Sequence, residues 1–183
     1  MRLSEFFTLD EAGHSQTARR LGIDNTPPKQ LHPALAHVAT GLLDPVRRKV
    51  GHPVTVSSWY RSPVLERVLC GSSFLKRCKR LNIQPDETAW GDYLARKQHP
   101  KGEAFDLEIP GIPNYELALW IQQNLRFDQL ILEFHERGKP GSGWVHASLS
   151  RGRNRNQVLT IGKGFAHQGL PDYGPLTHPK LLT

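Results

Sequence analysis

Three residues in the second half of the chain have the types that bind a metal ion. His99 and Asp106 lie seven positions apart in the segment QHPKGEAFDLEIPG, and His146 lies in GWVHASL. Two imidazoles and one carboxylate suit a catalytic zinc ion that keeps a fourth position for water. Zinc lowers the pKa of such a water to about 7, so that hydroxide can attack a carbonyl group. If the fold brings them together, the three residue types predict a hydrolytic metal centre.

Glu133, in the segment DQLILEF, is the predicted general base of this centre. A carboxylate that takes the proton from the attacking water contributes roughly 10² to 10⁴ in rate. Taken alone, each of the four residues also has an ordinary role, such as a loop histidine before proline or a solvent-facing strand glutamate. Other histidines, such as His52, His135 and His167, are assigned to ordinary roles. Among them, His135 is the main alternative candidate for a ligand.

Alternating apolar residues predict the strands that carry Asp106 and His146. In GEAFDLEI, apolar side chains alternate with Asp106, which therefore points away from the core. In GWVHASL, the same rule sets His146 on the face opposite Val145 and Ala147. We therefore expect both Asp106 and His146 to be displayed on a face of the sheet rather than buried.

A hairpin would bring Glu133 to the same face as His146. The segment QLILEFH predicts a strand, and the turn RGKPGSG would fold it back on GWVHASL. Pairing Glu133 with His146 places the hairpin midpoint between Lys139 and Pro140, inside this turn. Directly opposed residues have Cβ atoms about 4.5 to 5.5 Å apart. This register is assumed, and a slip of one residue would move Glu133 to the other face.

Helical patterns occupy much of the first half of the chain. Residues 1–28 form short amphipathic pieces and are expected to pack on the domain as an arm. Apolar residues recur at three- and four-residue steps from Leu31 to Val50, which predicts a helix whose last turn Pro45 can kink. After the strand pattern PVTVSSWYRSP, with Arg61 at its exit, VLERVL predicts a helix broken at Gly71.

The remaining segments complete one predicted α+β domain over residues 1–183. Residues 72–97 are polar, charged and irregular, which predicts an insertion or flap with helical pieces. Asn114 is the predicted cap of the helix YELALWIQQNL. Residues 162–183 have no periodicity and predict a tail that wraps the surface or is mobile.

Charge and cysteine content limit the classes of partner. The net charge of +7 favours polyanions, which include nucleic acid, acidic membrane surfaces and anionic cell-wall polymer. The densest basic run, RGRNRN, has no interleaved aromatic residues for base stacking, so we predict a solvated turn and expect no nucleic-acid partner. Cys70 and Cys78 are expected to be reduced thiols, because no framework of further cysteines accompanies them.

The chain shows no sign of membrane insertion or signal-directed export. Its start, MRLSEFFTLDEAG, lacks the charged beginning, apolar middle and cleavage site of a signal peptide. It contains no run of 18 apolar residues. We therefore expect synthesis in the cytoplasm without a signal peptide or a transmembrane segment.

Four blocks, in the order SSWYRSP, QHPKGEAFD, DQLILEF and GWVHASL, resemble the signature blocks of the M15 family of zinc peptidases. The resemblance is to its small peptidoglycan peptidases from bacteriophages and prophages, and it spans roughly residues 3 to 160. It implies zinc on His99, Asp106 and His146. It also implies that Arg61 reaches the substrate or the polarised carbonyl, since a guanidinium can hold a carboxylate through two parallel bonds.

Two features depart from the family pattern. Other branches carry their base three residues before the last histidine, where this chain has Gly143, so the resemblance assigns the base to Glu133. Lys97 replaces the serine that usually stands two residues before the first histidine. The stretch from Phe74 to Arg96 is also longer than in typical relatives, which would reshape the substrate groove.

The resemblance implies an α+β fold of the Hedgehog/D-Ala-D-Ala peptidase type, with a central antiparallel sheet and flanking helices. It implies a monomeric, endolysin-like metallopeptidase that hydrolyses the stem peptide of bacterial peptidoglycan. Such a protein would act on the cell wall or in the periplasm after release, or as part of a phage particle, and could meet an anionic cell-envelope surface. The alternative is a non-catalytic phage tail or wall-binding module that retains the fold. The bond that is cut stays open between D-Ala-D-Ala, L-Ala-D-Glu and a crosslink.

Overall fold

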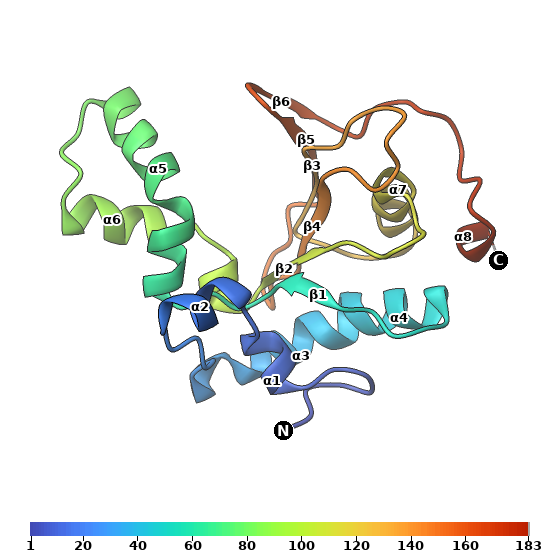
Figure 1. The fold of residues 1–183 in the computed structure, drawn as a ribbon, viewed down its shortest axis with the longest axis horizontal. Coiled ribbons are helices and arrows are strands. Elements are labelled where there is room, and N and C mark those ends of the chain that lie inside the picture. Colours follow the sequence, from blue (N-terminus) through green and yellow to red (C-terminus); the bar gives the residue numbers. More distant parts are fainter. Residues whose placement is uncertain (183) are drawn as a thin grey trace.

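A computed structural model describes residues 1–182 and has a six-stranded sheet at its centre, in the order β1-β2-β4-β3-β5-β6 (Figure 1). The strands are β1 (Val56–Ser58), β2 (Ala104–Leu107), β3 (Gln129–Glu133), β4 (Trp144–Ser148), β5 (Gln157–Gly162) and β6 (Phe165–Gln168). Neighbouring strands are antiparallel except β3 and β5, which are parallel. The predicted α+β class, with a mostly antiparallel sheet and flanking helices, is therefore confirmed.

Helices lie on both sides of this sheet. They are α1 (Leu9–Gly13), α2 (Gln16–Leu21), η1 (Lys29–Leu31), α3 (His32–Val38), η2 (Ala39–Leu43), α4 (Asp44–Val50), α5 (Pro63–Leu81), α6 (Glu87–Leu94), η3 (His99–Lys101), α7 (Asn114–Asn124) and α8 (Pro179–Leu182). Helix α7 lies on one side of the sheet, and the α5–α6 hairpin projects on the other (Figure 1). No helix within residues 1–182 is long and apolar enough to cross a membrane.

The main hydrophobic core lies between the sheet and the helices α3, α4 and α7. The inward faces predicted from alternation are confirmed, because the apolar residues of β2, β3 and β4 are fully buried; these are Phe105, Leu107, Leu130, Leu132, Val145 and Ala147. Leu117 and Ile121 of α7 pack in the same core. The alternation leaves Asp106 of β2 and His146 of β4 on the opposite face, which is also largely buried.

The helical run from η1 to α4 is less regular than its apolar pattern predicts. A π-helical turn, Ala39–Leu43, separates α3 from α4 and precedes Pro45, which stands in the first turn of α4. Proline lacks the N–H group that would bond to the carbonyl of Gly41, so the helix changes its hydrogen-bond pattern just before this residue.

Helix α5 continues through Gly71, so the predicted break at this residue is wrong. Ser62 caps the helix by accepting from the N–H of Leu65, and Pro63 occupies its first position. Glycine inside a helix costs about 1 kcal/mol relative to alanine. The later turns compensate, because Phe74 and Cys78 are buried against α6.

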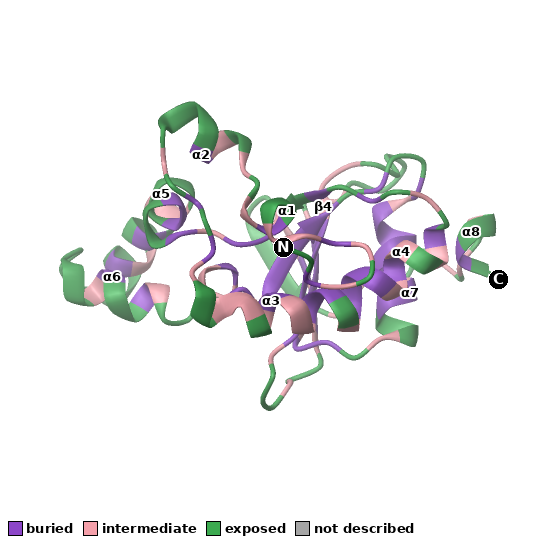
Figure 2. Cartoon of the chain, turned by 90° about the horizontal axis from the view of Figure 1, so that it is seen from below, coloured by how far each residue is buried: buried purple, intermediate pink, exposed green. Residues whose placement is uncertain are grey.

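Residues 72–97 contain the predicted helical pieces, which are more extensive than the irregular pattern indicated: the second half of α5 and all of α6. The two helices enclose a small aromatic cluster, which we call the hairpin cluster, formed by Phe74, Cys78, Trp90 and Tyr93. The rings of Phe74 and Trp90 meet edge to face, with centroids 5.2 Å apart. Buried residues line the facing sides of α5 and α6, while the outer sides are exposed (Figure 2).

The tail after Gly162 is more ordered than predicted. Residues 165–168 form β6, whose side chains are all exposed, so the strand carries no apolar alternation that could reveal it. Further on, the backbone N–H groups of Thr177 and His178 donate to the carboxylate of Glu116 in α7, at 2.9 and 2.7 Å. The tail thus wraps the surface over α7. This was one of the two predicted possibilities, the other being a mobile tail.

Cys70 and Cys78 carry free thiols. They stand eight residues apart on one helix, which separates their Cα atoms by roughly 12 Å. A disulfide requires about 7 Å or less, so the two residues cannot pair while α5 is intact.

We expect Cys70 to be alkylated slowly by iodoacetamide at pH 8. Burial, together with the nearby carboxylate of Glu66, raises the pKa of the Cys70 thiol to about 11. At pH 8 the reactive thiolate is then on the order of one part in a thousand. Mass spectrometry of timed samples would measure the rate, with the urea-unfolded chain as the control. Equal rates in the folded and unfolded chains would contradict this prediction.

Candidate metal centre

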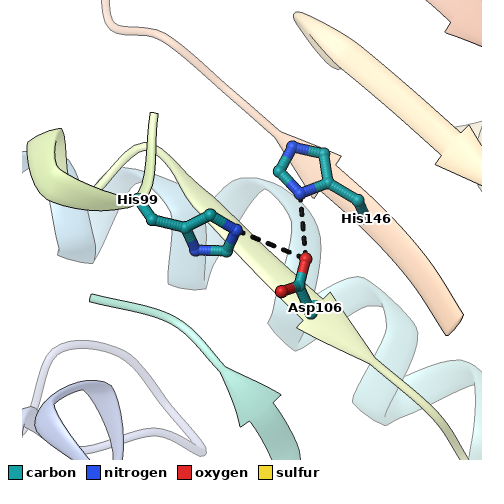
Figure 3. A group of neighbouring side chains, drawn as sticks. All are labelled: His99, Asp106 and His146. Carbon is teal, nitrogen blue, oxygen red and sulfur yellow. Dashed lines mark hydrogen bonds and ion pairs between the residues drawn. The ribbon is translucent and has the colours of Figure 1, made fainter. Parts of the chain in front are cut away.

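His99, Asp106 and His146 converge at one point, as Figure 3 shows. Each offers one ligand atom, and these atoms all lie within 4.8 Å of one another. Asp106 and His146 are directly opposed on β2 and β4, so the hydrogen-bond register of the sheet brings two of the three side chains together. His99 comes from η3, which immediately precedes β2. The convergence predicted from residue types is thus present in the structure.

The ring of His99 is oriented by a backbone contact. Its Nδ1 atom lies 2.6 Å from the carbonyl oxygen of Trp59. A carbonyl oxygen only accepts hydrogen bonds, so Nδ1 carries the proton and Nε2 is directed to the centre. Nε2 lies 3.3 Å from Oδ1 of Asp106. Such a second contact is the usual way in which a ligand histidine is held in one tautomer.

The position of His99 along the chain is held by the residue before it. The Nε2 amide of Gln98 donates to Oδ2 of the buried Asp128 at 2.6 Å. Asp128 also accepts from the guanidinium of Arg155, the last arginine of the run RGRNRN. This run is therefore only partly the solvated turn that was predicted, because Arg155 binds a carboxylate next to the site. No signal in the sequence identified Asp128.

All three candidate ligands are buried, which corrects the prediction that Asp106 and His146 are displayed. Asp106 and His146 are each 7% exposed, and His99 is 6% exposed. The sequence indicated the correct face, but not that η3 and Arg61 would cover it. The Nδ1 atom of His146 lies 2.9 Å from Oδ1 of Asp106, and the two imidazole rings meet edge to face with centroids 5.1 Å apart.

The directions of the pKa shifts of Asp106 and His99 suit metal binding. Burial opposes ionisation of Asp106, but His99 and His146 outweigh it and hold the pKa of this carboxyl well below its usual range. Burial lowers the pKa of His99, which favours the neutral imidazole. Metals bind the ionised carboxylate and the neutral imidazole, so both shifts favour an ion at this place.

Arg61 reaches the centre from the start of α5 and is held there by the protein itself. Its Nη2 donates to Oδ2 of Asp106, and its Nε donates to Oγ of Ser58 at 2.8 Å. Its Nη1 lies 3.6 Å from Oε2 of Glu66, a carboxylate that is 1% exposed. The guanidinium therefore orients Asp106, a role that the sequence did not suggest. Arg61 and Ser58 also line a cleft of about 1120 Å³, whose lining does not include the three candidate ligands or Glu133.

Glu133 lies on the same face as His146, but in a register that differs from the predicted one. Glu133 pairs with Trp144, and Ile131 pairs with His146, so the predicted pairing is wrong by two residues. An even shift keeps the side chain on the same face. Glu133 is thus a diagonal neighbour of His146 on β4. Burial raises the pKa of its carboxyl, the direction expected for a group that must exchange protons near neutral pH.

The end of β3 is shaped by two residues with positive φ. Phe134 has φ 53° and Gly143 has φ 69°. A Cβ atom on Gly143 would overlap the carbonyl oxygen of Glu133, so only glycine allows the two backbones to approach here. The same hairpin is tied to α7 by Asn114, whose amide donates to the carbonyls of Ser142 and Gly143. The predicted capping role of Asn114 is therefore wrong: Pro113 holds the cap position.

Replacement of Gly143 by alanine should destabilise the protein by at least about 2 kcal/mol, because it adds a steric overlap to an unfavourable φ. Urea unfolding would measure the loss. Gly164→Ala is the matched control, since Gly164 has φ 85° but open space around it. The difference between the free energies of unfolding of the two variants measures the cost of the overlap with the carbonyl oxygen of Glu133. Equal losses of stability in both variants would contradict this account.

The remaining histidines stay outside the centre. His135 lies beyond the end of β3, where its Nδ1 is 3.2 Å from the carbonyl of Ser142 and its ring packs against Tyr173. His52 and His167 form contacts only with neighbouring backbone carbonyls among the hydrogen bonds of residues 1–182. The assignment of these residues to ordinary roles is consistent with their positions.

Comparison with known proteins found no matching family model, no matching curated protein and no matching solved structure. The interpretation of this site therefore depends on its own geometry and on the residue types that form it.

Proposed function

We propose that this protein is a zinc-dependent peptidase of the M15 type that hydrolyses the peptide part of bacterial peptidoglycan. The observation that carries the proposal is the convergence of His99, Asp106 and His146, two imidazoles and one carboxylate whose ligand atoms lie within 4.8 Å of one another. Catalytic zinc sites in general have three protein ligands of these types and a fourth position that water occupies. The α+β fold is compatible with the Hedgehog/D-Ala-D-Ala peptidase type, which we propose as its finer class.

In this proposal His99, Asp106 and His146 would hold the ion, and its chemistry would be to lower the pKa of a water and to polarise the scissile carbonyl. Glu133 accepts the proton from the attacking water and later donates it to the leaving amine. Arg61 keeps the carboxylate of Asp106 in place and faces the cleft, where its positive charge can steady negative charge that develops on the substrate. The residues predicted to be catalytic, Glu133 and Arg61, thus flank the ligand set.

Digestion of purified peptidoglycan tests this proposal. The metal content of the purified protein would be measured first, and mass spectrometry would then identify the new peptide termini. We expect about one zinc per chain, new amino and carboxyl termini within the stem peptide, loss of this activity with a chelator, and recovery on addition of zinc. The position of the new termini would also decide between the D-Ala-D-Ala, L-Ala-D-Glu and crosslink bonds.

Two outcomes would contradict the proposal. Binding to the wall without new termini in the zinc-loaded protein would favour the alternative of a non-catalytic wall-binding module. Absence of metal binding would remove the basis of both the cofactor and the reaction. For an active enzyme we propose action as a monomer on the cell wall or in the periplasm after release, or within a phage particle.

A further inference from the structure

The outer side of the α5–α6 hairpin carries an unusual share of exposed apolar residues. Twelve large hydrophobic residues are exposed within residues 1–182, and six of them lie between positions 64 and 83; these are Val64, Val68, Leu69, Leu75, Leu81 and Ile83. Isolated exposed hydrophobic residues are ordinary, but a concentration in one projecting element indicates a contact surface. The hairpin stands away from the body of the protein (Figures 1 and 2).

Three of these residues form a line along α5. Val64, Val68 and Leu75 are 60%, 51% and 55% exposed, and their spacings of four and seven residues place them on one side of the helix. Ser72 and Lys79 continue the same line at four-residue steps from Val68 and Leu75, and both are exposed. We call these five residues the α5 stripe. It is about 22 Å long at the helical rise of 1.5 Å per residue.

The charges that α5 itself carries after Glu66 are all basic, while the acidic residues of the hairpin, Asp86, Glu87 and Asp92, lie on α6 and its cap. Between Glu66 and Asp86 the chain has five basic residues and no acidic one. Arg67 forms an ion pair with Glu87, which leaves a group at the end of α5 that we call the basic tip: Lys76, Arg77, Lys79 and Arg80. The α5 stripe beside the basic tip is complementary to a partner that has negative charges at its surface and an apolar layer beneath them.

Nucleic acid fits this surface less well than lipid does. Base stacking requires exposed aromatic rings, but Phe74, Trp90 and Tyr93 are buried in the hairpin cluster. The residues exposed instead are aliphatic. A helix with aliphatic residues and neighbouring lysine and arginine binds at the interface of a bilayer, where the cations meet anionic headgroups and the aliphatic chains enter the acyl boundary.

We propose that the α5 stripe and the basic tip dock this protein on an anionic lipid bilayer. Helix α5 lies along the interface with Val64, Val68 and Leu75 toward the acyl chains. Lys76, Lys79 and Arg80 contact the headgroups. This inference does not depend on the metal centre, because the stripe lies on the outer side of α5 and contains none of the candidate ligands.

Co-sedimentation of the full chain with large vesicles tests the proposal. Vesicles of phosphatidylcholine alone are compared with vesicles that contain equal parts of phosphatidylglycerol and phosphatidylcholine. We expect binding to the anionic vesicles that weakens as salt is raised, and at least about tenfold weaker binding without the anionic lipid. The apolar variant Val68→Gln/Leu75→Gln and the charge variant Lys76→Gln/Lys79→Gln/Arg80→Gln should each reduce binding by about tenfold or more.

Matched controls separate the α5 surface from general charge and exposure. Arg151→Gln/Arg153→Gln/Lys163→Gln removes the same number of exposed cations elsewhere, and Leu21→Gln/Phe165→Gln removes two exposed apolar residues elsewhere. Both control variants should bind like the unaltered protein, and circular dichroism should show that all variants are folded. Equal losses in variants and controls would overturn the proposal. So would equal binding to neutral vesicles, binding to DNA or wall polymer but not vesicles, or a stripe-dependent dimer in light scattering.

Discussion

Replacing His146 with glutamine should weaken zinc binding by more than about 100-fold, because loss of a direct ligand must exceed the 10- to 100-fold cost of losing an outer contact. His146 is directly opposed to Asp106 on the neighbouring strand and supplies one of the two imidazoles of the centre. Competition with a chromogenic chelator would measure the affinity. Added zinc should raise the melting temperature of the unaltered protein but not that of the variant, since binding to the folded state alone is stabilising.

His135→Gln is the control for this experiment. It makes the same substitution on the adjoining hairpin, where His135 contacts Ser142 and Tyr173 rather than the centre. This variant should retain both the zinc affinity and the thermal shift. If His146→Gln also retained them, the three converging residues would not form the metal site, and the proposed reaction would lose its basis.

Replacing Glu133 with glutamine should reduce hydrolysis by roughly 10² to 10⁴ while leaving zinc affinity within about twofold of the original. Glutamine has nearly the same shape but cannot accept the proton of the attacking water. Glu133 is a diagonal neighbour of His146 in the β3–β4 pairing, so it stands beside the centre without belonging to the ligand set. Initial rates on peptidoglycan fragments, followed by mass spectrometry, and a parallel zinc titration would separate the two effects.

Glu136→Gln serves as the control for the Glu133 variant. Glu136 lies on the same hairpin but is exposed and paired with Lys139. We expect unchanged rates in this variant. Equal rates for the unaltered protein and for Glu133→Gln would remove Glu133 from the mechanism while leaving the metal centre in place.

The sequence predicted the strands that carry the candidate site, because alternation in GEAFDLEI and GWVHASL reports directly which side chains share a face. It did not predict the register of the β3–β4 hairpin. That register depends on the positive φ of Phe134 and on the close approach of Gly143 to Glu133, neither of which has a simple pattern in the sequence. The burial of Asp106 and His146 was also not predicted; Arg61, which contacts Asp106, lies 45 positions away in the chain.

Helix α5 shows a different limit of local patterns. The glycine at position 71 suggested a break, but contacts formed by Phe74 and Cys78 with α6 maintain the helix, and these contacts join residues more than ten positions apart. The role of Asp128 depends likewise on partners distant in the chain, Gln98 and Arg155. Glu66 contacts Arg61 only five positions away, but Arg61 in turn binds Asp106, which is distant in the chain.

The hairpin cluster shares no member with the main core among the residues that the structure describes. The four residues of this cluster therefore take no part in the packing beneath β2 and β4. The outer part of the hairpin can therefore vary in evolution while Arg61, Glu66 and the candidate ligands of the sheet are retained.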